Sequence, residues 1–195
     1  MKQYKGLPLF EVVFDDEQSV FNNVAFVTAP AIEEGFVQLS KQEDESVKLS
    51  VDVEKRIVCG PALIPDMPIY RDQGGRKFYI TWTTDTIKQM AINFFQHSRQ
   101  NAGNVEHQMP VNGITFFESY IIDKERGINP KEFETLPNGT WMLSAKVTNN
   151  EVWEMVKDGT LTGFSIDASN VQFREDKVIE TLEDFIEFLN KTKKS

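Results

Sequence analysis

Residues 104–118 read NVEHQMPVNGITFFE and decide how the middle of the chain folds. The Asn112-Gly113 pair is a strong signal for a two-residue type I′ hairpin turn, because both residues tolerate a positive φ. Pairing residues outward from this turn sets His107 opposite Glu118, with apolar pairs between them and the turn. The sequence therefore predicts an antiparallel hairpin that brings a histidine and a carboxylate together on one face.

A histidine beside a carboxylate is typical of a catalytic base and the acid that orients it. The same spacing also describes a surface pair that closes a hairpin, and spacing alone leaves both interpretations open. In this register Pro110 falls at a position that makes no ladder hydrogen bond, which favours an edge strand.

His97 is the other histidine of the chain. It lies near the end of a predicted helix over residues 84–99, in which apolar side chains recur at helical spacing. Because a cation stabilises a helix C-terminus, we predict a structural role for His97. The positions expected to form the buried face of this helix are Ile87, Met90, Ala91, Phe94 and Phe95.

Ser165 is the candidate nucleophile. It lies between bulky apolar residues, two positions after Gly163, in a predicted strand over residues 161–167. A glycine in a strand permits a close backbone approach, as at a substrate groove. Asp167 stands where the Gly-x-Ser-x-Gly turn of α/β-hydrolases needs glycine, so that turn is excluded. A buried serine bonded to its neighbours is the alternative interpretation.

Short strands dominate the rest of the chain, because β-branched and aromatic runs lie between turn signals. Helices are predicted over residues 84–99 and 151–158, without the regular strand–helix alternation of a doubly wound sheet. We therefore predict an α+β fold in which a mostly antiparallel barrel or sheet is flanked by helices. The predicted strands cover residues 9–14, 24–27, 36–39, 56–64, 77–82, 139–147 and 161–167.

Three segments are predicted along the chain. Residues 1–50 form a strand-rich segment that ends in an acidic linker, and residues 51–173 form the main domain. Residues 174–195 form an amphipathic helix, because their apolar side chains share one helical face. These side chains are Val178, Ile179, Leu182, Phe185, Ile186 and Leu189.

Composition excludes several classes of function. The formal net charge of −9 over 195 residues disfavours nucleic-acid binding, which needs clustered Lys and Arg. The single cysteine, Cys59, predicts a buried inert thiol in a reducing compartment. No segment has the about 20 apolar residues of a membrane span, and the N-terminus does not resemble a signal peptide. Without a Cys pair or His-x-x-x-His spacing, neither a metal nor a cofactor is expected.

Several segments, taken in order, resemble the phage prohead proteases, which are herpesvirus-assemblin-like serine peptidases. The closer similarity is to the branch of phage serine protease domains found in phages of Gram-positive bacteria and Bacteroidetes. The similarity extends over residues 20–168. The segments that carry it are Val27 to Phe36, Ile69-Tyr70-Arg71, Val105-Glu106-His107, Phe117-Glu118-Ser119, Gly139-Thr140-Trp141, Val152-Trp153, Gly159 and Gly163-Phe164-Ser165-Ile166.

This resemblance implies an assemblin-like β-barrel and peptide hydrolysis through an acyl-enzyme. Ser165 matches the family serine and His107 the family histidine. The third catalytic residue varies in the superfamily. Glu118 is the expected acid from the hairpin register, with Glu106 and Asp167 as alternatives. Backbone N–H groups near Ser165 are expected to form the oxyanion hole.

The resemblance also implies the setting. Phage scaffold and major capsid proteins would be the substrates, inside the procapsid in the cytoplasm of an infected bacterium. The herpesvirus relatives act as dimers, so a homodimer is one expectation, with the apolar stripe of residues 178–189 either forming its contact or packing on its own domain. The alternative function is a non-catalytic capsid-assembly or scaffold-like protein that keeps the protease fold.

Overall fold

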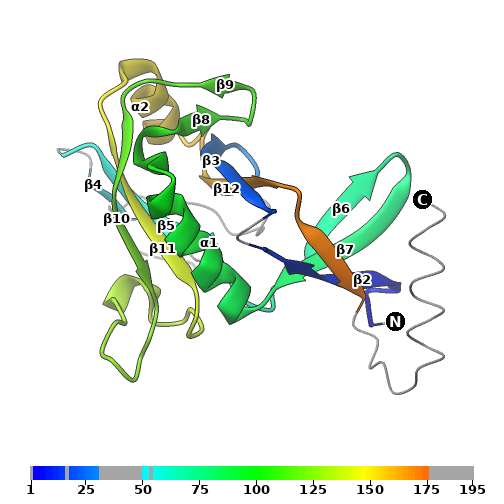
Figure 1. Cartoon of the computed structure of the whole chain (residues 1–195). Helices are drawn as coiled ribbons and strands as arrows, with labels where there is room; N and C mark the ends of the chain where they lie inside the picture. The colour runs from blue at the N-terminus through cyan, green and yellow to red at the C-terminus, as the bar shows by residue number, and fades with distance from the viewer. Residues whose placement is uncertain (1, 16–17, 31–49, 53–54, 176–195) are drawn as a thin grey trace, which may run out of the picture.

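The computed structural model describes residues 2–15, 18–30, 50–52 and 55–175. In these residues the chain forms three β-sheets, accompanied by two α-helices (Figure 1). Eight of the ten strand pairings are antiparallel and two are parallel. The predicted α+β class with mostly antiparallel pairing is therefore confirmed.

The first sheet joins the two ends of the described chain. Its strands are β1 (Gln3–Tyr4), β2 (Leu7–Val13), β6 (Ile69–Gln73), β7 (Arg76–Trp82) and β13 (Gln172–Glu175). β2 pairs in parallel with β7 and antiparallel with β13. β6 and β7 form a hairpin that turns at Gly74 and Gly75, both of which have a positive φ.

The second sheet lies behind the longer helix in Figure 1. Its strands are β4 (Ser50–Asp52), β5 (Ile57–Leu63), β10 (Ile114–Ile121) and β11 (Trp141–Val147), in the order β10-β11-β5-β4. All of its pairings are antiparallel. Every side chain of β11 except that of Lys146 is buried, which makes this strand the centre of the fold.

The third sheet carries two of the residues singled out above, Ser165 and His107. Its strands are β3 (Val20–Val27), β8 (Gly103–Val105), β9 (Met109–Pro110) and β12 (Gly163–Ser169), in the order β12-β3-β8-β9. β3 pairs antiparallel with β12 and parallel with β8. Strands from residues 1–50 thus pair with strands of the main body in both this sheet and the first one.

Both predicted helices of the body are present among the described residues. α1 (Thr84–Gln96) begins at Thr83, whose hydroxyl accepts a hydrogen bond from the Thr86 N–H. α2 (Asn150–Lys157) is capped by Asn149, whose side chain accepts a hydrogen bond from the Val152 N–H. Two short 3₁₀ turns, η1 (Arg99–Asn101) and η2 (Lys131–Phe133), complete the helical content of this part of the chain.

The core is an aromatic cluster where α1 meets the second and third sheets. Ring pairs within it are 5.2 to 6.2 Å apart and mostly edge-to-face, an arrangement worth about 0.5–1.5 kcal/mol per pair beyond burial. This cluster fixes α1 and β12 relative to the same core. Its members are Phe21, Phe26, Phe94, Phe116, Trp141 and Phe164.

The predictions for the buried face of α1, for the barrel and for the two ends of the chain have different outcomes. Ile87, Met90, Ala91 and Phe94 are buried as predicted, but the side chain of Phe95 is 45% exposed. No sheet of the described residues closes on itself, so the closed barrel is not present there and the assemblin-like fold stays a prediction. The strand predicted over residues 36–39, the acidic linker, and all but the first two residues of the tail helix lie outside the described residues.

Candidate active site

Ser165 lies in the middle of β12, an outer strand of the third sheet. It pairs with Ala25 of β3, which in turn pairs with Asn104 of β8. Gly163 brings the start of β12 close to Pro30: a Cβ atom added there would lie 2.6 Å from the Pro30 Cβ. The close approach at Gly163 is therefore present, but it is made to Pro30 of the same chain and not to a substrate groove. Ser165 itself is half-buried.

A small cavity lies beside Ser165, where β12 meets β5 and the β6–β7 hairpin. Its volume is about 20 Å³, enough for about one water-sized group. Most of its lining is apolar, and Arg71 is the charged residue among its members. The lining residues are Ala62, Leu63, Ile69, Arg71, Trp82, Phe164, Ser165 and Ile166.

His107 lies in the turn between β8 and β9, and this corrects the predicted hairpin. Val105 pairs with Met109, and the Gln108 N–H donates to the Val105 carbonyl at 3.1 Å. Glu106 and His107 are the central residues, with φ of 54° and 55°. The two consecutive positive φ values therefore fall at Glu106-His107, not at Asn112-Gly113, in a loop of three residues between the paired Val105 and Met109.

The predicted pairing of His107 with Glu118 is wrong. Glu118 lies on β10 of the second sheet, where it pairs with Ser144 of β11 and its carboxylate accepts a hydrogen bond from the Ser144 hydroxyl. Asn112 and Gly113 instead form a loop against the start of α2, since the Gly113 carbonyl accepts from the Thr148 N–H at 2.7 Å. The geometric reason for choosing Glu118 as the catalytic acid is thereby lost.

Ser165 and His107 belong to the same sheet but do not touch each other. β12 and β8 are separated by two strand spacings, about 10 Å. His107 also lies three residues beyond Asn104, which is level with Ser165. The hydrogen bonds of the described residues include none between Ser165 and His107. Because the His107 side chain is exposed, its position is set by the turn and not by packing.

Along the strand direction, the two alternative acids, Glu106 and Asp167, lie on opposite sides of Ser165. Glu106 precedes His107 in the turn, and its carboxylate accepts a hydrogen bond from the Thr28 N–H at 2.6 Å. Asp167 pairs with Asn23, and its carboxylate accepts from the amides of Asn22 and Asn23 at 3.2 and 3.3 Å. Asp167 lies on the side of Ser165 that points away from the turn, so Glu106 is the acid nearer to His107.

His97 has the structural position that the sequence predicts, whereas Cys59 is half-buried and not fully buried as predicted. His97 is the C-cap of α1, and its Nδ1 lies 3.1 Å from the Asn93 carbonyl oxygen. Burial raises the pKa of the Cys59 thiol, and its sulfur lies 4.0 Å from the Tyr120 hydroxyl. A thiol that resists ionisation is a poor nucleophile, in agreement with the predicted inert role.

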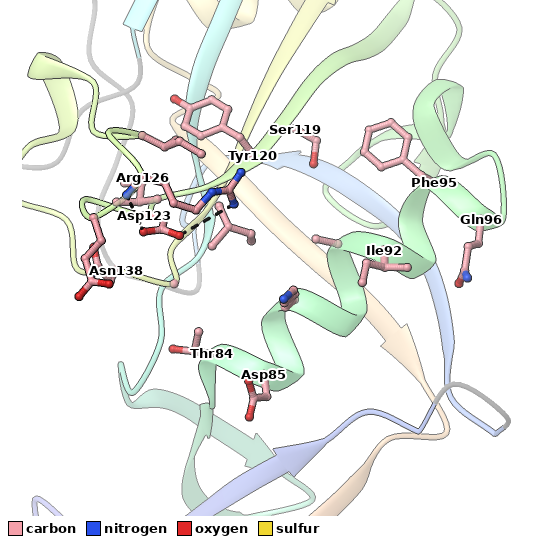
Figure 2. A pocket seen from close by; sticks show the side chains of 17 residues that line it. Thr84, Asp85, Ile92, Phe95, Gln96, Ser119, Tyr120, Asp123, Arg126 and Asn138 are labelled. Atoms are coloured by element: carbon pink, nitrogen blue, oxygen red, sulfur yellow. Dashed lines mark hydrogen bonds and ion pairs between the residues drawn. The ribbon is translucent and has the colours of Figure 1, made fainter.

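A much larger groove lies elsewhere, between α1 and the end of β10. Figure 2 shows Ile92 and Phe95 of α1 on one side of it and Ser119 and Tyr120 of β10 on the other. Its volume is about 800 Å³, but none of Ser165, His107, Glu118, Glu106 and Asp167 lines it. The exposed Phe95 belongs to this groove, which explains why the helical pattern misassigned it to the core.

Metal sites and membrane-spanning helices are the two other features considered for the described residues. No group of three or more His, Cys, Asp and Glu side chains there could hold a metal ion. No helix in the same residues is long and apolar enough to span a bilayer.

Comparison with known proteins gives one family. The family model described as "Putative phage serine protease XkdF" matches residues 44–173. This range contains Ser165, His107 and the cavity beside Ser165, while β2 and β3 precede it.

Two curated proteins of Bacillus subtilis (strain 168) are similar to the chain. The phage-like element PBSX protein XkdF is 26% identical over 125 residues, 64% of this chain and 41% of that protein. The uncharacterized protein YqbD is 32% identical over 84 residues, 43% of this chain and 24% of that protein. The chain thus spans less than half the length of these relatives, and no solved structure matches it.

Proposed function

Because the chain belongs to the family of phage serine proteases named after XkdF, we propose that it is a serine endopeptidase with Ser165 as its nucleophile. The observation that carries this proposal is the position of Ser165. It is half-buried on an outer strand and borders a cavity of about 20 Å³, in which a substrate carbonyl oxygen fits. A serine wholly packed in the core could not be reached by a peptide.

In the proposed reaction the Ser165 Oγ attacks the carbonyl carbon of a peptide bond. The hydroxyl proton passes to His107 while the π electron pair of the carbonyl moves onto its oxygen. Collapse of this intermediate breaks the C–N bond, and His107 returns the proton to the leaving amine. Water then hydrolyses the acyl-enzyme by the same steps.

His107 must approach Ser165 for this proton transfer, and the turn supports such a movement. Positive φ at two consecutive non-glycine residues costs on the order of 1–3 kcal/mol each. We propose that this strained, exposed turn adopts a second conformation when a substrate binds. Catalytic hydrogen bonds are also commonly long in the absence of substrate. We propose that Glu106 holds this turn, with Asp167 as the weaker candidate for the third catalytic residue.

A fluorophosphonate probe tests the proposal directly, because it phosphonylates an activated serine. We expect one adduct, located at Ser165 by peptide mass spectrometry, and none in Ser165→Ala. His107→Ala should reduce the labelling rate by a factor on the order of 10³, whereas His97→Ala, the matched control at the end of α1, should leave it unchanged. A wild-type protein that is not labelled at Ser165 would reject the endopeptidase.

The substrates and setting are part of the same proposal. Cleavage of phage scaffold and capsid proteins inside a procapsid is supported by the phage origin of the matched family alone. Mass spectrometry of these proteins after co-expression with the wild-type or Ser165→Ala chain tests it. Self-association is tested by light scattering of the whole chain and of a chain cut after Glu175, which removes the predicted apolar stripe.

One observation favours the alternative, a non-catalytic assembly protein: Ser165 and His107 share no hydrogen bond among the described residues. In that case the large groove between α1 and β10 would be the functional surface. The probe separates the two functions, because an assembly protein needs no activated serine.

A further inference from the structure

Two residues that line the cavity beside Ser165 carry hydrogen-bond donors, and one of these donors has no partner. Trp82 is 6% exposed, and its Nε1–H is buried without a hydrogen-bond partner. The Arg71 guanidinium donates to the Tyr70 carbonyl at 3.0 Å, and no carboxylate of the described residues forms an ion pair with it. Buried polar groups are nearly always satisfied, so the unpaired Trp82 N–H needs an explanation, and beside it stands a guanidinium without a carboxylate partner.

The register of the first sheet places these two residues on one face. Ile69 pairs with Ile80 and Arg71 with Phe78, so β6 and β7 present Arg71 and Trp82 to the same side. Both line the cavity that Ser165 lines from β12. The cavity is thus formed by strands of all three sheets, which converge on the proposed nucleophile.

The chemistry of the lining restricts what the cavity can bind. An indole N–H and a guanidinium donate hydrogen bonds and accept none, so they require an acceptor oxygen. The other lining residues besides Ser165 are apolar. Burial lowers the pKa of Arg71, but a guanidinium retains its charge at neutral pH. A cation in an apolar surrounding stabilises negative charge far better than it does in water.

The size of the cavity restricts the ligand further. A cavity of about 20 Å³ accommodates one oxygen atom but is too small for a whole carboxylate side chain. An acidic substrate side chain is therefore too large, whereas the carbonyl oxygen of a peptide bond attacked by Ser165 has the right size. That oxygen gains a full negative charge in the tetrahedral intermediate.

We propose that Arg71 and Trp82 form the oxyanion hole of Ser165, with side-chain donors in place of the usual pair of backbone N–H groups. This inference rests on the proposed function of Ser165. As the Oγ–carbon bond forms, the π electron pair moves onto the carbonyl oxygen, which the Trp82 Nε1–H and the Arg71 guanidinium then hold. When the C–N bond breaks, the pair returns and the two donors are released.

Two substitutions test the donors separately. Trp82→Phe removes the N–H and keeps the aromatic ring, and Arg71→Met removes the charge and keeps most of the side-chain length. Loss of an oxyanion donor costs on the order of 10²–10³ in rate. We expect a tenfold or greater fall in the fluorophosphonate labelling rate for Trp82→Phe and a hundredfold fall for Arg71→Met. Arg71→Lys, which restores a cation, should recover part of the rate.

The controls separate chemistry from folding. Trp141→Phe removes another buried indole donor, one that binds the Ser119 hydroxyl at the large groove, and should not change labelling. Hydrolysis of p-nitrophenyl acetate should show a lower kcat with an unchanged KM, because the donors act only in the transition state. Should Arg71→Met fail to fold in circular dichroism, Trp82→Phe decides by itself.

The outcomes distinguish this inference from the proposed function. If the wild-type protein is labelled at Ser165 and folded Trp82→Phe and Arg71→Met are labelled equally fast, the oxyanion hole lies elsewhere and the endopeptidase stands. A rise in KM without a fall in kcat also overturns the inference, because it indicates ground-state binding. If wild-type Ser165 is not labelled, both proposals are rejected together.

Discussion

The Glu106 carboxylate accepts a hydrogen bond from the Thr28 N–H at 2.6 Å, and it thereby ties the turn that carries His107 to the end of β3. The Glu106 N–H also donates to the Phe26 carbonyl at 3.0 Å. These two bonds hold one residue of the turn on β3 and leave the His107 side chain exposed. Glu106 thus limits the positions from which His107 can approach Ser165.

Glu106→Ala should therefore lower the labelling rate at Ser165 strongly and the free energy of unfolding only slightly. The hydrogen bond contributes about 0.5–1.5 kcal/mol to stability, whereas a misplaced base costs about tenfold to a hundredfold in rate. Glu106→Gln keeps an acceptor oxygen for Thr28 and should retain most of the activity. The labelling rate at Ser165 and urea unfolding measure both effects. Equal loss in the Gln and Ala variants would mean that the charge matters, and Glu106 would then be the acid that orients His107.

Glu118→Gln should leave turnover within about twofold of the wild type, the scale of an uncoupled surface change. Glu118 lies in the second sheet beside Ser144, while His107 and Ser165 lie in the third. A glutamine can still accept the hydrogen bond from Ser144. Steady-state hydrolysis of p-nitrophenyl acetate provides the measurement. A folded Gln variant with a strongly reduced kcat would return Glu118 to the active site.

Glu118 and Ser165 illustrate how much of the fold and of the candidate site could be predicted from the sequence. Most strands and both body helices could be predicted, because their apolar periodicity and caps are local signals. The hairpin register could not. Asn112-Gly113 has the residues that a type I′ turn prefers, yet Glu106-His107 adopts the two positive φ values. Contacts to Thr28 and Phe26, about 80 residues earlier in the chain, select that turn.

The cavity beside Ser165 could not be predicted for a related reason. Arg71 is an ordinary charged residue in a hairpin, and Trp82 reads as the apolar end of a strand. Only the convergence of the first sheet on β12 makes them neighbours of Ser165. The Gly163-Phe164-Ser165 segment carries a local signal, since its glycine marks a close approach, and the contact with Pro30 explains that signal.

Alkaline pH should destabilise the protein through Cys59 and Tyr120. Burial raises the pKa of the Cys59 thiol above its ordinary value of 9.0, and the neighbouring Glu118 charge adds to the rise. The pKa of the Tyr120 hydroxyl is also raised above its ordinary value of 10.0, mainly by burial and secondly by the neighbouring Cys59. The unfolded chain therefore loses protons first as the pH rises, and the free energy of unfolding falls with pH from about 9 upward.

Urea unfolding at pH 8, 9 and 10 measures this fall. Cys59→Ala and Tyr120→Phe each remove one titrating group and should flatten the curve, and the double variant should flatten it further. Lys146→Met, which changes a cation on the neighbouring strand β11, provides the control and should keep the wild-type slope. A wild-type unfolding free energy that is constant from pH 8 to 10 would contradict the raised pKa values of both groups.

Gly163→Ala should displace β12 and with it Ser165. The added Cβ would lie 2.6 Å from the Pro30 Cβ and 2.7 Å from its Cγ, distances that require one of the two segments to shift. Overpacking of this kind costs about 1–3 kcal/mol. Because Ser165 is only two residues away, the labelling rate at Ser165 should fall at temperatures where the variant is still fully folded.

A second substitution at Pro30 identifies the cause. Pro30→Gly removes both atoms that the new Cβ would meet, whereas Pro30→Ala keeps the nearer one. In the Gly163→Ala background, Pro30→Gly should therefore restore more stability and more labelling than Pro30→Ala does, and the double-mutant cycle should give a coupling energy of about 1 kcal/mol or more. Equal effects of the two Pro30 substitutions would show that the methyl group disturbs β12 by some other contact.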